Sequence, residues 1–243
     1  MISDSFAWNI RTELLIGGKN LENLLSKHVL IVGVGGVGAY IAEMLARAGI
    51  GEMTLIDADT VSLTNKNRQL IALDSNLGKP KVEVMAARLR DINPEIRLHL
   101  VEEFLRDART VEILEAAHYD YVADAIDSLS PKVFLIYHTL QKGYPLISAM
   151  GAGGKLDPDL IQCKDIKKTN YCRLAHAIRK RLHRMGIRSG FKAVFSPEEV
   201  CEDAVIIESS PETNKLSTVG TISYMPAMFG CRMAAEILKD LRG

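Results

Sequence analysis

The run His28-Val29-Leu30-Ile31-Val32-Gly33-Val34-Gly35-Gly36-Val37-Gly38 decides the fold of this chain. Four apolar residues after His28 predict a buried strand, and the amphipathic segment 39–48 predicts a helix directly after the glycines. Glycines at this spacing between a strand and a helix indicate a nucleotide-binding turn. Gly33 lets the chain turn, Gly35 leaves space for a phosphate beside bare backbone, and Gly38 lets the helix pack closely on the strand. The free N–H groups at the start of the helix then face the anion.

The residues that follow the second expected strand, 53–56, indicate which nucleotide is bound. Asp57 is placed to accept hydrogen bonds from ribose hydroxyls, which fits a dinucleotide and ATP alike. Arg68 and Lys81 then supply two cations, which suit a triphosphate better than the cofactor of a dehydrogenase. The candidate nucleotide contacts are Gly33, Gly35, Gly36, Gly38, Asp57, Asp59, Asn65, Asn67, Arg68, Gln69 and Lys81.

Some of these residues also have purely structural interpretations. A lysine in the first turn of a helix, such as Lys81 after Gly78 and Pro80, is most often a solvated surface residue. Asn65 and Asn67 belong to a residue type that commonly caps helices and forms turns. Their nucleotide interpretation therefore depends on their place in the sequence beside the glycine turn.

Strands and helices are expected to alternate through the first 150 residues. The expected strands are 28–32, 53–56, 97–101, 121–123 and 145–148, and the expected helices are one that closes at 21–25, then 39–48, 79–92, 111–116 and 131–141. This order predicts an α/β fold: a Rossmann-like, mostly parallel sheet with helices on both faces, extended by a C-terminal α/β portion. Ligands of such sheets bind outside the carboxyl ends of the strands.

The length and composition fit one domain of 243 residues, with a nucleotide-binding half at 1–150 and a substrate-binding and dimerisation portion at 151–243. The N-terminus lacks a charged segment followed by an apolar one, and no apolar run is long enough to span a membrane, so we expect a cytoplasmic protein. The four cysteines lack C-x-x-C spacing, which argues against a disulfide framework and a structural zinc. They are Cys163, Cys172, Cys201 and Cys231.

Asp127 is the candidate metal ligand. It follows the strand that leads into Asp124, so its carboxylate is expected to face the nucleotide, and Mg²⁺ prefers carboxylate and phosphate oxygens. The competing interpretation is an N-cap for the helix at 131–141, although Ser128 and Ser130 are available for that role.

Several motifs together resemble the ThiF and MoeB adenylating proteins, which are similar to ubiquitin-activating enzymes. The matching segments are 33–38, 45–51, 57–59, 64–69, 78–82, 93–94 and 124–127. The resemblance implies that Asp57 holds the ribose, Arg68 and Lys81 the phosphates, and Asp127 the magnesium. Asn65 lies in the nucleotide region of that family. The family also implies a homodimer in which Arg11, from the N-terminal helix, reaches the ATP of the other subunit.

The second half resembles one branch of that family, the tRNA threonylcarbamoyladenosine dehydratases. The similar segments are 151–158, 165–169 and 195–198, and the zinc-binding cysteine pairs of many MoeB and ThiF relatives are absent. Near Ser217 and Thr218 the chain has no cysteine where relatives often carry one, so no thiol nucleophile is assigned. The resemblance leaves open whether a sulfur-transfer protein is a partner.

The charge pattern points to a nucleic acid partner independently of any family. From Lys164 to Lys192 there are ten Lys or Arg residues against one acid, Asp165, although the whole chain has 30 basic and 30 acidic residues. Such a basic segment on an otherwise acidic chain suits a polyanion such as tRNA. A solvated helix at 174–185 is the alternative, but solvated faces usually mix both signs of charge.

The reaction expected from these residues is ATP- and Mg²⁺-dependent adenylation of a carboxylate, with Arg68, Lys81, Asp127 and Arg11 as the catalytic residues. In the dehydratase interpretation the substrate is the threonyl carboxylate of the modified tRNA adenosine. Two alternatives remain: an activator of a ubiquitin-like sulfur carrier, which would need a cysteine, and a nicotinamide-dependent oxidoreductase or non-catalytic nucleotide-binding module. The segment 186–216 is expected to cover the substrate as a mobile region.

Overall fold

A seven-stranded sheet forms the centre of the computed structural model, which describes residues 8–200, 202–206 and 218–242. The strands are β1 (His28–Val32), β2 (Glu52–Ile56), β3 (Arg97–Val101), β4 (Tyr121–Asp124), β5 (Leu146–Ala149), β6 (Gln162–Asp165) and β7 (Lys192–Phe195). Their order is β3-β2-β1-β4-β5-β7-β6, and all pairs are parallel except β6 with β7. The predicted fold class is confirmed.

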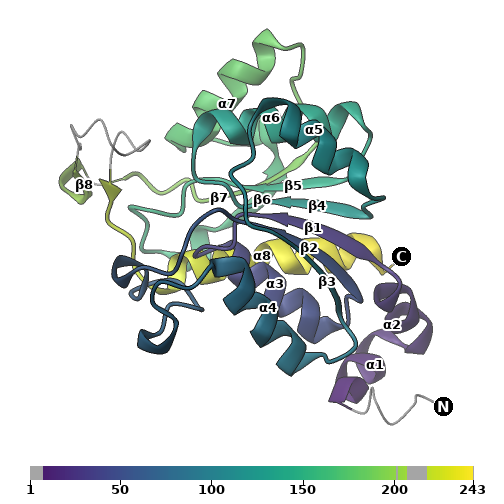
Figure 1. The fold of residues 1–243 in the computed structure, drawn as a ribbon. Coiled ribbons are helices and arrows are strands. Elements are labelled where there is room, and N and C mark those ends of the chain that lie inside the picture. The colour runs from purple at the N-terminus through teal and green to yellow at the C-terminus, as the bar shows by residue number, and fades with distance from the viewer. Residues whose placement is uncertain (1–7, 201, 207–217, 243) are drawn as a thin grey trace.

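Helices cover both faces of this sheet (Figure 1). The helices are α1 (Ile10–Ile16), α2 (Gly18–Leu25), α3 (Gly38–Ala48), α4 (Lys81–Ile92), α5 (Asp107–Ala116), α6 (Leu129–Gln141), α7 (Arg173–Arg184) and α8 (Tyr224–Leu241). The short 3₁₀ helices are η2 (Leu63–Asn65), η3 (Asp74–Asn76), η4 (Pro158–Leu160), η5 (Ile166–Lys168) and η6 (Glu202–Ala204). In Figure 1, α3, α4 and α8 lie on one face, and α5, α6 and α7 lie on the other. The alternation expected from the sequence is present, and α5 begins earlier, at Asp107.

The side chains of β1 point alternately to the two faces of the sheet and so belong to two separate layers of the core. Val29 and Ile31 belong to the hydrophobic cluster under α3 and α8, whereas Leu30 and Val32 belong to the cluster under α6 and α7. Because successive side chains of a strand point to opposite faces, an uninterrupted apolar run is what a strand buried on both faces requires. This strand therefore holds the glycine turn at a fixed place between the two layers.

The second half of the chain completes the same sheet. β7 lies between β5 and the antiparallel edge strand β6, and α8 returns to pack against α3. Residues 186–216 are not mobile throughout, because residues 192–195 form the buried strand β7. The small two-stranded sheet of β8 (Val205–Ile206) and β9 (Thr218–Val219) follows, while residues 207–217 lie outside the described residues.

The remaining features of the fold are the place of the N-terminal helices and the absence of a membrane-spanning helix in the described residues. α1 and α2 lie at the end of the sheet where β1 begins, and the N–H of Gly51, just before β2, donates to the carbonyl of Leu24 in α2 (Figure 1). Within the described ranges, no helix has both the length and the apolar character needed to cross a membrane.

Candidate adenylation site

The glycine turn has a conformation that side chains would prevent. Gly33 has φ +92°, and a Cβ atom there would lie 2.8 Å from the carbonyl oxygen of Ala125. A Cβ atom on Gly38 would lie 1.7 Å from the carbonyl oxygen of Gly33. α3 begins at Gly38, and the side chain of its N-cap residue, Val37, makes no capping hydrogen bond. The first N–H groups of this helix are therefore suited to bind an anion.

Asp57 fastens the end of β2 to the glycine turn. Its Oδ2 accepts a hydrogen bond of 2.7 Å from the N–H of Val34, and its Oδ1 accepts one of 2.9 Å from the N–H of Asp59. Burial raises the pKa of the Asp57 carboxyl above its ordinary value, while the positive charge of Lys81 opposes that shift. Each carboxylate oxygen has a second lone pair, so these bonds leave Asp57 able to accept from a ribose hydroxyl.

Lys81 is buried at this edge of the sheet. It is only 4% exposed, and its ammonium lies 2.6 Å from Oδ2 of Asp59 and 4.0 Å from Oδ1 of Asp57. Asp59 is itself largely exposed, with 69% of its side chain accessible. The interpretation of Lys81 as a solvated surface lysine is therefore wrong. A buried cation next to the glycine turn is what a bound polyphosphate requires.

Asn65 and Asn67 hold the segment that follows Asp59. Asn65 is buried and its Oδ1 accepts from the N–H of Ser62, so it caps η2 as the structural interpretation proposed. The amide of Asn67 donates to the carbonyl oxygen of Thr221, which ties this segment to the chain before α8. The two asparagines thus shape the wall of the site.

Arg68 and Gln69 lie against the glycine turn. A Cβ atom added to Gly36 would lie 3.6 Å from the carbonyl oxygen of Arg68. A Cβ atom added to Gly35 would lie 3.6 Å from Nε2 of Gln69. The guanidinium of Arg68 donates to the carbonyl oxygen of Thr64 and is partly exposed. Oε1 of Gln69 is buried without a hydrogen-bond partner in the described part of the chain. Such an acceptor suits a donor group of a ligand.

Asp127 follows β4 at the same edge as the glycine turn. The N–H of Ala125 donates to the carbonyl of Val32, so the segment after β4 runs beside the end of β1. Asp127 is exposed two residues further on. Ser128 is the N-cap residue of α6, so Asp127 does not have the capping position of the alternative interpretation.

Beneath this segment is a buried ion pair that the sequence analysis missed. Nζ of Lys132 lies 2.8 Å from Oδ2 of Asp124, and both side chains are 0% exposed. The hydroxyl of Ser148 donates to the same carboxylate at 2.6 Å, and Lys132 also donates to the carbonyl oxygen of Ile126. This cluster fixes the chain from Asp124 to Ile126. The sequence did contain a signal for this buried pair. Lys132 lies at helical spacing from the buried residues Leu135, Ile136 and Thr139, which places it on the apolar face of α6.

Arg11 is the one predicted site residue that the structure keeps apart from the others. It is exposed on α1, which lies at the amino ends of the strands, opposite the glycine turn (Figure 1). Within one chain Arg11 is therefore not part of the site.

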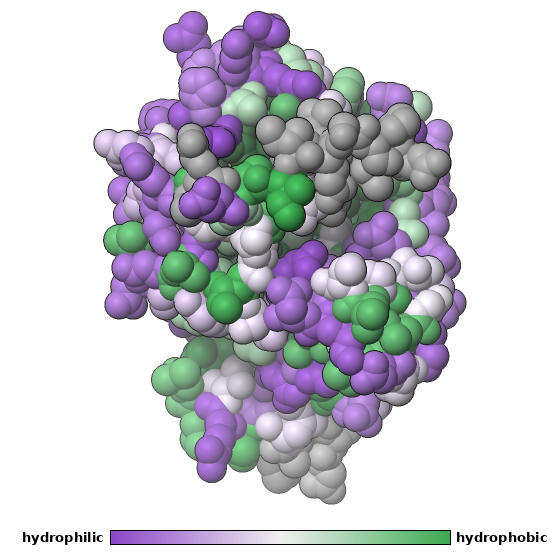
Figure 2. Space-filling model, turned by 90° about the vertical axis from the view of Figure 1, so that its left-hand side faces the viewer, coloured by the Kyte–Doolittle hydropathy of each residue, from purple (hydrophilic) through white to green (hydrophobic). Residues whose placement is uncertain are grey.

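The basic segment divides between the two faces of the sheet. α7 buries Ala175, Ile178 and Leu182 and presents basic side chains outward. In Figure 2, which views the end of the molecule where the parallel strands finish, hydrophilic residues cover the top, where α7 lies in Figure 1. The exposed basic residues are Lys164, Lys167, Lys168, Arg173, Lys180, Arg181, Arg184 and Arg188.

Two members of the basic segment are engaged elsewhere. The ammonium of Lys192 lies 2.8 Å from Oδ1 of Asp240 and 3.0 Å from Oε2 of Glu236, both on α8. Arg179 donates to the carbonyl oxygen of Thr169 and is half-buried. Lys192 therefore belongs to the opposite face, and the basic surface is smaller than the sequence predicted.

Burial makes two of the described cysteine thiols poor nucleophiles at neutral pH. Burial raises the pKa of the Cys163 thiol to about 11, and it also raises the pKa of the Cys231 thiol. Cys172 is buried, and its sulfur accepts from the N–H of Ala175 as the N-cap of α7. Cys201 lies outside the described residues.

Comparison with known proteins identifies the family. The ThiF family model matches residues 8–243. The tRNA threonylcarbamoyladenosine dehydratase of Bacillus subtilis (strain 168) is 39% identical over 237 residues, which cover 95% of this chain and 93% of the relative. The crystal structure of the corresponding E. coli enzyme in complex with ATP superimposes with a TM-score of 0.88 at 38% identity, covering 99% of this chain and 96% of that chain.

Likeness to the carrier-activating branch is limited to part of the chain. The molybdopterin-synthase adenylyltransferase of Escherichia coli (strain K12) is 39% identical over 127 residues, which cover 52% of this chain and 50% of the relative. The likeness to dehydratases, in contrast, extends through the C-terminal portion. It agrees with the glycine turn and with the buried cation beside it. The chain belongs to the ThiF family and, within it, to the tRNA threonylcarbamoyladenosine dehydratases.

Proposed function

We propose that this chain uses ATP to dehydrate, and thereby cyclise, the threonylcarbamoyl group of threonylcarbamoyladenosine in tRNA. Lys81 is the observation that carries the proposal, because its buried ammonium lies beside the glycine turn, where it can pair with a polyphosphate as well as with Asp59. The full-length likeness to dehydratases supports the identity of the substrate.

The first step is adenylation of the threonyl carboxylate. One carboxylate oxygen attacks the α-phosphorus of ATP, the bond to the β-phosphate oxygen breaks, and pyrophosphate leaves with the electron pair. Lys81 and Arg68 offset the negative charge that develops on the leaving group. Asp57 accepts from the ribose hydroxyls, and the glycine turn with Asp59, Asn65, Asn67 and Gln69 forms the remaining wall of the nucleotide site.

Asp127 is the residue that would hold Mg²⁺. An exposed carboxylate beside the phosphate-binding turn fits a hard cation that prefers oxygen ligands. When bound, the ion would neutralise charge on the phosphate oxygens.

The second step closes the ring. An atom of the neighbouring carbamoyl group attacks the activated acyl carbon, AMP leaves with one of the former carboxylate oxygens, and the attacking group loses a proton. The product is lighter by one water, and the site contributes mainly by positioning the two groups. The raised thiol pKa values of Cys163 and Cys231 agree with a reaction that uses no enzyme nucleophile. Because neither step uses sulfur, a sulfur-transfer partner is not part of the proposal.

The tRNA is proposed to dock on the basic surface of α7 and the segment 164–168. Seven exposed cations belong to these two segments, and contacts to phosphates position a nucleic acid without reading its sequence. The C-terminal portion, 151–243, would then bind the substrate and take part in dimerisation.

A homodimer would give Arg11 its role. α1 exposes Leu14 and Leu15, which are 82% and 85% accessible, so this helix carries apolar surface suited to burial against a second copy. Arg11 of one subunit would then contact the ATP of the other, since its helix α1 lies at the opposite end of the sheet from the site of its own chain.

The experiment that tests this proposal measures the release of AMP and pyrophosphate from ATP in the presence of different tRNAs. Both products should form in equal amounts with tRNA that carries threonylcarbamoyladenosine, and neither should form with the same tRNA lacking the modification. If a small carrier protein ending in Gly-Gly triggers pyrophosphate release and modified tRNA does not, the chain is a carrier activator instead.

A further inference from the structure

Four polar side chains share one face at the opposite end of the sheet, where β1, β2 and β3 begin. His28 pairs in register with Glu52, and Thr54 pairs with His99. Because alternate residues of a strand share a face, His28, Glu52, Thr54 and His99 all point to the face that α5 and α6 partly cover. None of these residues takes part in the proposed reaction.

The potential ligand atoms lie close together. Oε1 of Glu52 is 2.8 Å from Nε2 of His99 and 3.6 Å from Nδ1 of His28, and all three atoms lie within 4.8 Å of one another. Ligands bound at about 2.0–2.2 Å to one zinc ion stand about 3–4 Å apart. The 3.6 Å distance already matches this spacing, whereas the other two distances would have to adjust for the three atoms to surround a common centre.

The other polar atoms of the cluster are already held in place. Nε2 of His28 lies 2.9 Å from the hydroxyl oxygen of Thr54, which leaves Nδ1 directed toward Glu52. Oε2 of Glu52 accepts from the guanidinium of Arg97 at 2.6 and 3.1 Å, which leaves Oε1 for the histidines. Outer partners of this kind orient the ligands in known metal sites.

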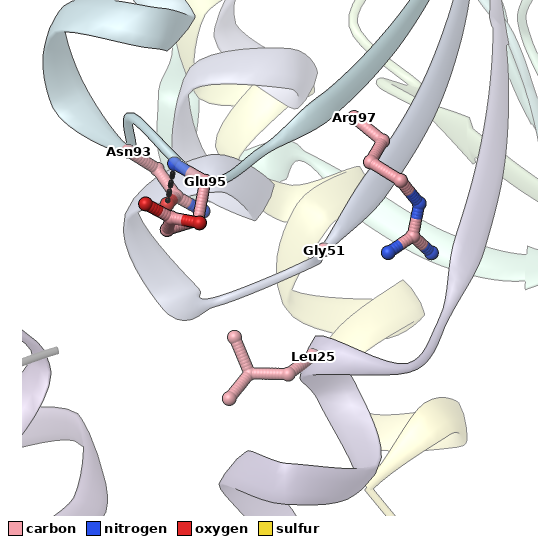
Figure 3. A pocket seen from close by; sticks show the side chains of 5 residues that line it. All are labelled: Leu25, Gly51, Asn93, Glu95 and Arg97. Atoms are coloured by element: carbon pink, nitrogen blue, oxygen red, sulfur yellow. Dashed lines mark hydrogen bonds between the residues drawn. The ribbon is translucent and has the colours of Figure 1, made fainter. Parts of the chain in front are cut away.

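Solvent reaches the cluster from one side. The His99 side chain is 56% exposed, whereas the His28 side chain is 9% exposed. Arg97 also lines a small adjacent pocket with Leu25, Gly51, Asn93 and Glu95 (Figure 3). Water can therefore complete the coordination of an ion that the three side chains hold.

We propose that His28, Glu52 and His99 form a binding site for one divalent transition-metal ion such as Zn²⁺. Two imidazoles and one carboxylate suit zinc, cobalt or nickel, whereas Mg²⁺ prefers oxygen ligands alone. The ion would join the edge strand β3 to β1 and β2. Arg97 binds the Glu52 carboxylate, and its positive charge repels a cation. The affinity of this site for zinc should therefore be lower than that of a closed structural zinc site.

Titration calorimetry of the metal-free full chain with ZnCl₂ tests this proposal. We expect one zinc ion per chain, and binding at least tenfold weaker in His99→Ala, whose exposed side chain on an edge strand can be removed without affecting the core. Thr54→Val should weaken binding about tenfold through the orientation of His28. The matched control is the double variant His176→Ala/His183→Ala, which removes the histidines that line a hollow on α7 and should bind zinc as the parent does.

A second measurement distinguishes coordination by these side chains from nonspecific metal binding. Co²⁺ in place of Zn²⁺ should give the visible absorption of a cobalt ion with nitrogen ligands in the parent chain and in the α7 control, but not in His99→Ala. Equal zinc affinity in His99→Ala and the parent would overturn the proposal, and so would loss of binding in the α7 control alone.

Discussion

The two ends of the central strands carry charged clusters in opposite surroundings. At the carboxyl ends Asp124 and Lys132 are completely buried, and Lys81 is nearly so. At the amino ends the ion pair of Lys27 with Asp120 keeps 23% and 21% of the two side chains exposed. Burying a charge costs stability unless the charge is well paired. The charges at the carboxyl ends should therefore be more sensitive to the loss of a partner than those at the amino ends.

The largest difference between the two ends should appear in stability. Lys132→Met leaves the Asp124 carboxylate buried without its partner and should lower the free energy of unfolding by about 3–5 kcal/mol. The corresponding change at the amino ends, Lys27→Met, should cost less than about 1 kcal/mol, because water still solvates Asp120. Urea unfolding of the two variants measures both values. Similar losses would show that burial does not distinguish the two pairs.

Within one chain, catalysis should depend on the charged groups at the carboxyl ends. Lys81→Ala removes the buried cation and should lower the turnover rate about 100- to 1000-fold. Its matched control is Lys79→Ala, an exposed lysine two residues earlier, which should keep the parent rate. Release of AMP from modified tRNA measures both variants. If the two lysine variants had the same rate, Lys81 would have no special role.

Binding of tRNA should be weakened by charge changes on α7 and not by equal charge changes on α2 and α8. In Lys180→Glu/Arg184→Glu, lost phosphate contacts should lower the slope of log affinity against log salt by about 1 for each contact. The control Lys19→Glu/Lys239→Glu changes the charge equally on α2 and α8, away from that surface. Filter binding at several salt concentrations gives the slopes. Equal slopes in the two double variants would remove α7 from the proposed interface.

The smallest effect concerns His28 and pH. Burial lowers the pKa of His28 below its ordinary value, and Glu52 and Asp120 only partly oppose that shift. The unfolded chain therefore takes up this proton first as pH falls through about 6.5, and the contribution of His28 to stability is lost toward acid. His28→Asn should reduce the fall in stability between about pH 7.5 and about pH 5.5. An unchanged pH dependence in chemical unfolding of this variant would contradict the assignment.

The sequence predicted the first half of the molecule well because each element there has a local signal. The apolar run before Gly33 identifies a strand buried on both faces, and the glycines permit only one kind of turn after it. Asp57 follows at the spacing that parallel strands impose on the chain. The fold class and the edge of the sheet that contains the site were therefore predictable.

The second half was less predictable because its strands depend on distant partners. β6 has four residues of mixed polarity, and only pairing with β7 makes it an antiparallel edge strand. The same limit hid the partner of Lys132, since Asp124 and Ser148 meet this lysine only when α6 folds back over β4 and β5. The sequence also could not show that Lys192 faces α8 and leaves the basic surface.

Mass spectrometry of the tRNA nucleosides tests the central claim most directly. Modified tRNA is incubated with the chain, ATP and Mg²⁺, with Lys81→Ala as the matched control. The proposed reaction predicts a nucleoside lighter than threonylcarbamoyladenosine by one water, formed only with ATP and hardly formed by the variant. An unchanged nucleoside after prolonged incubation with the parent chain and ATP would contradict the proposed function.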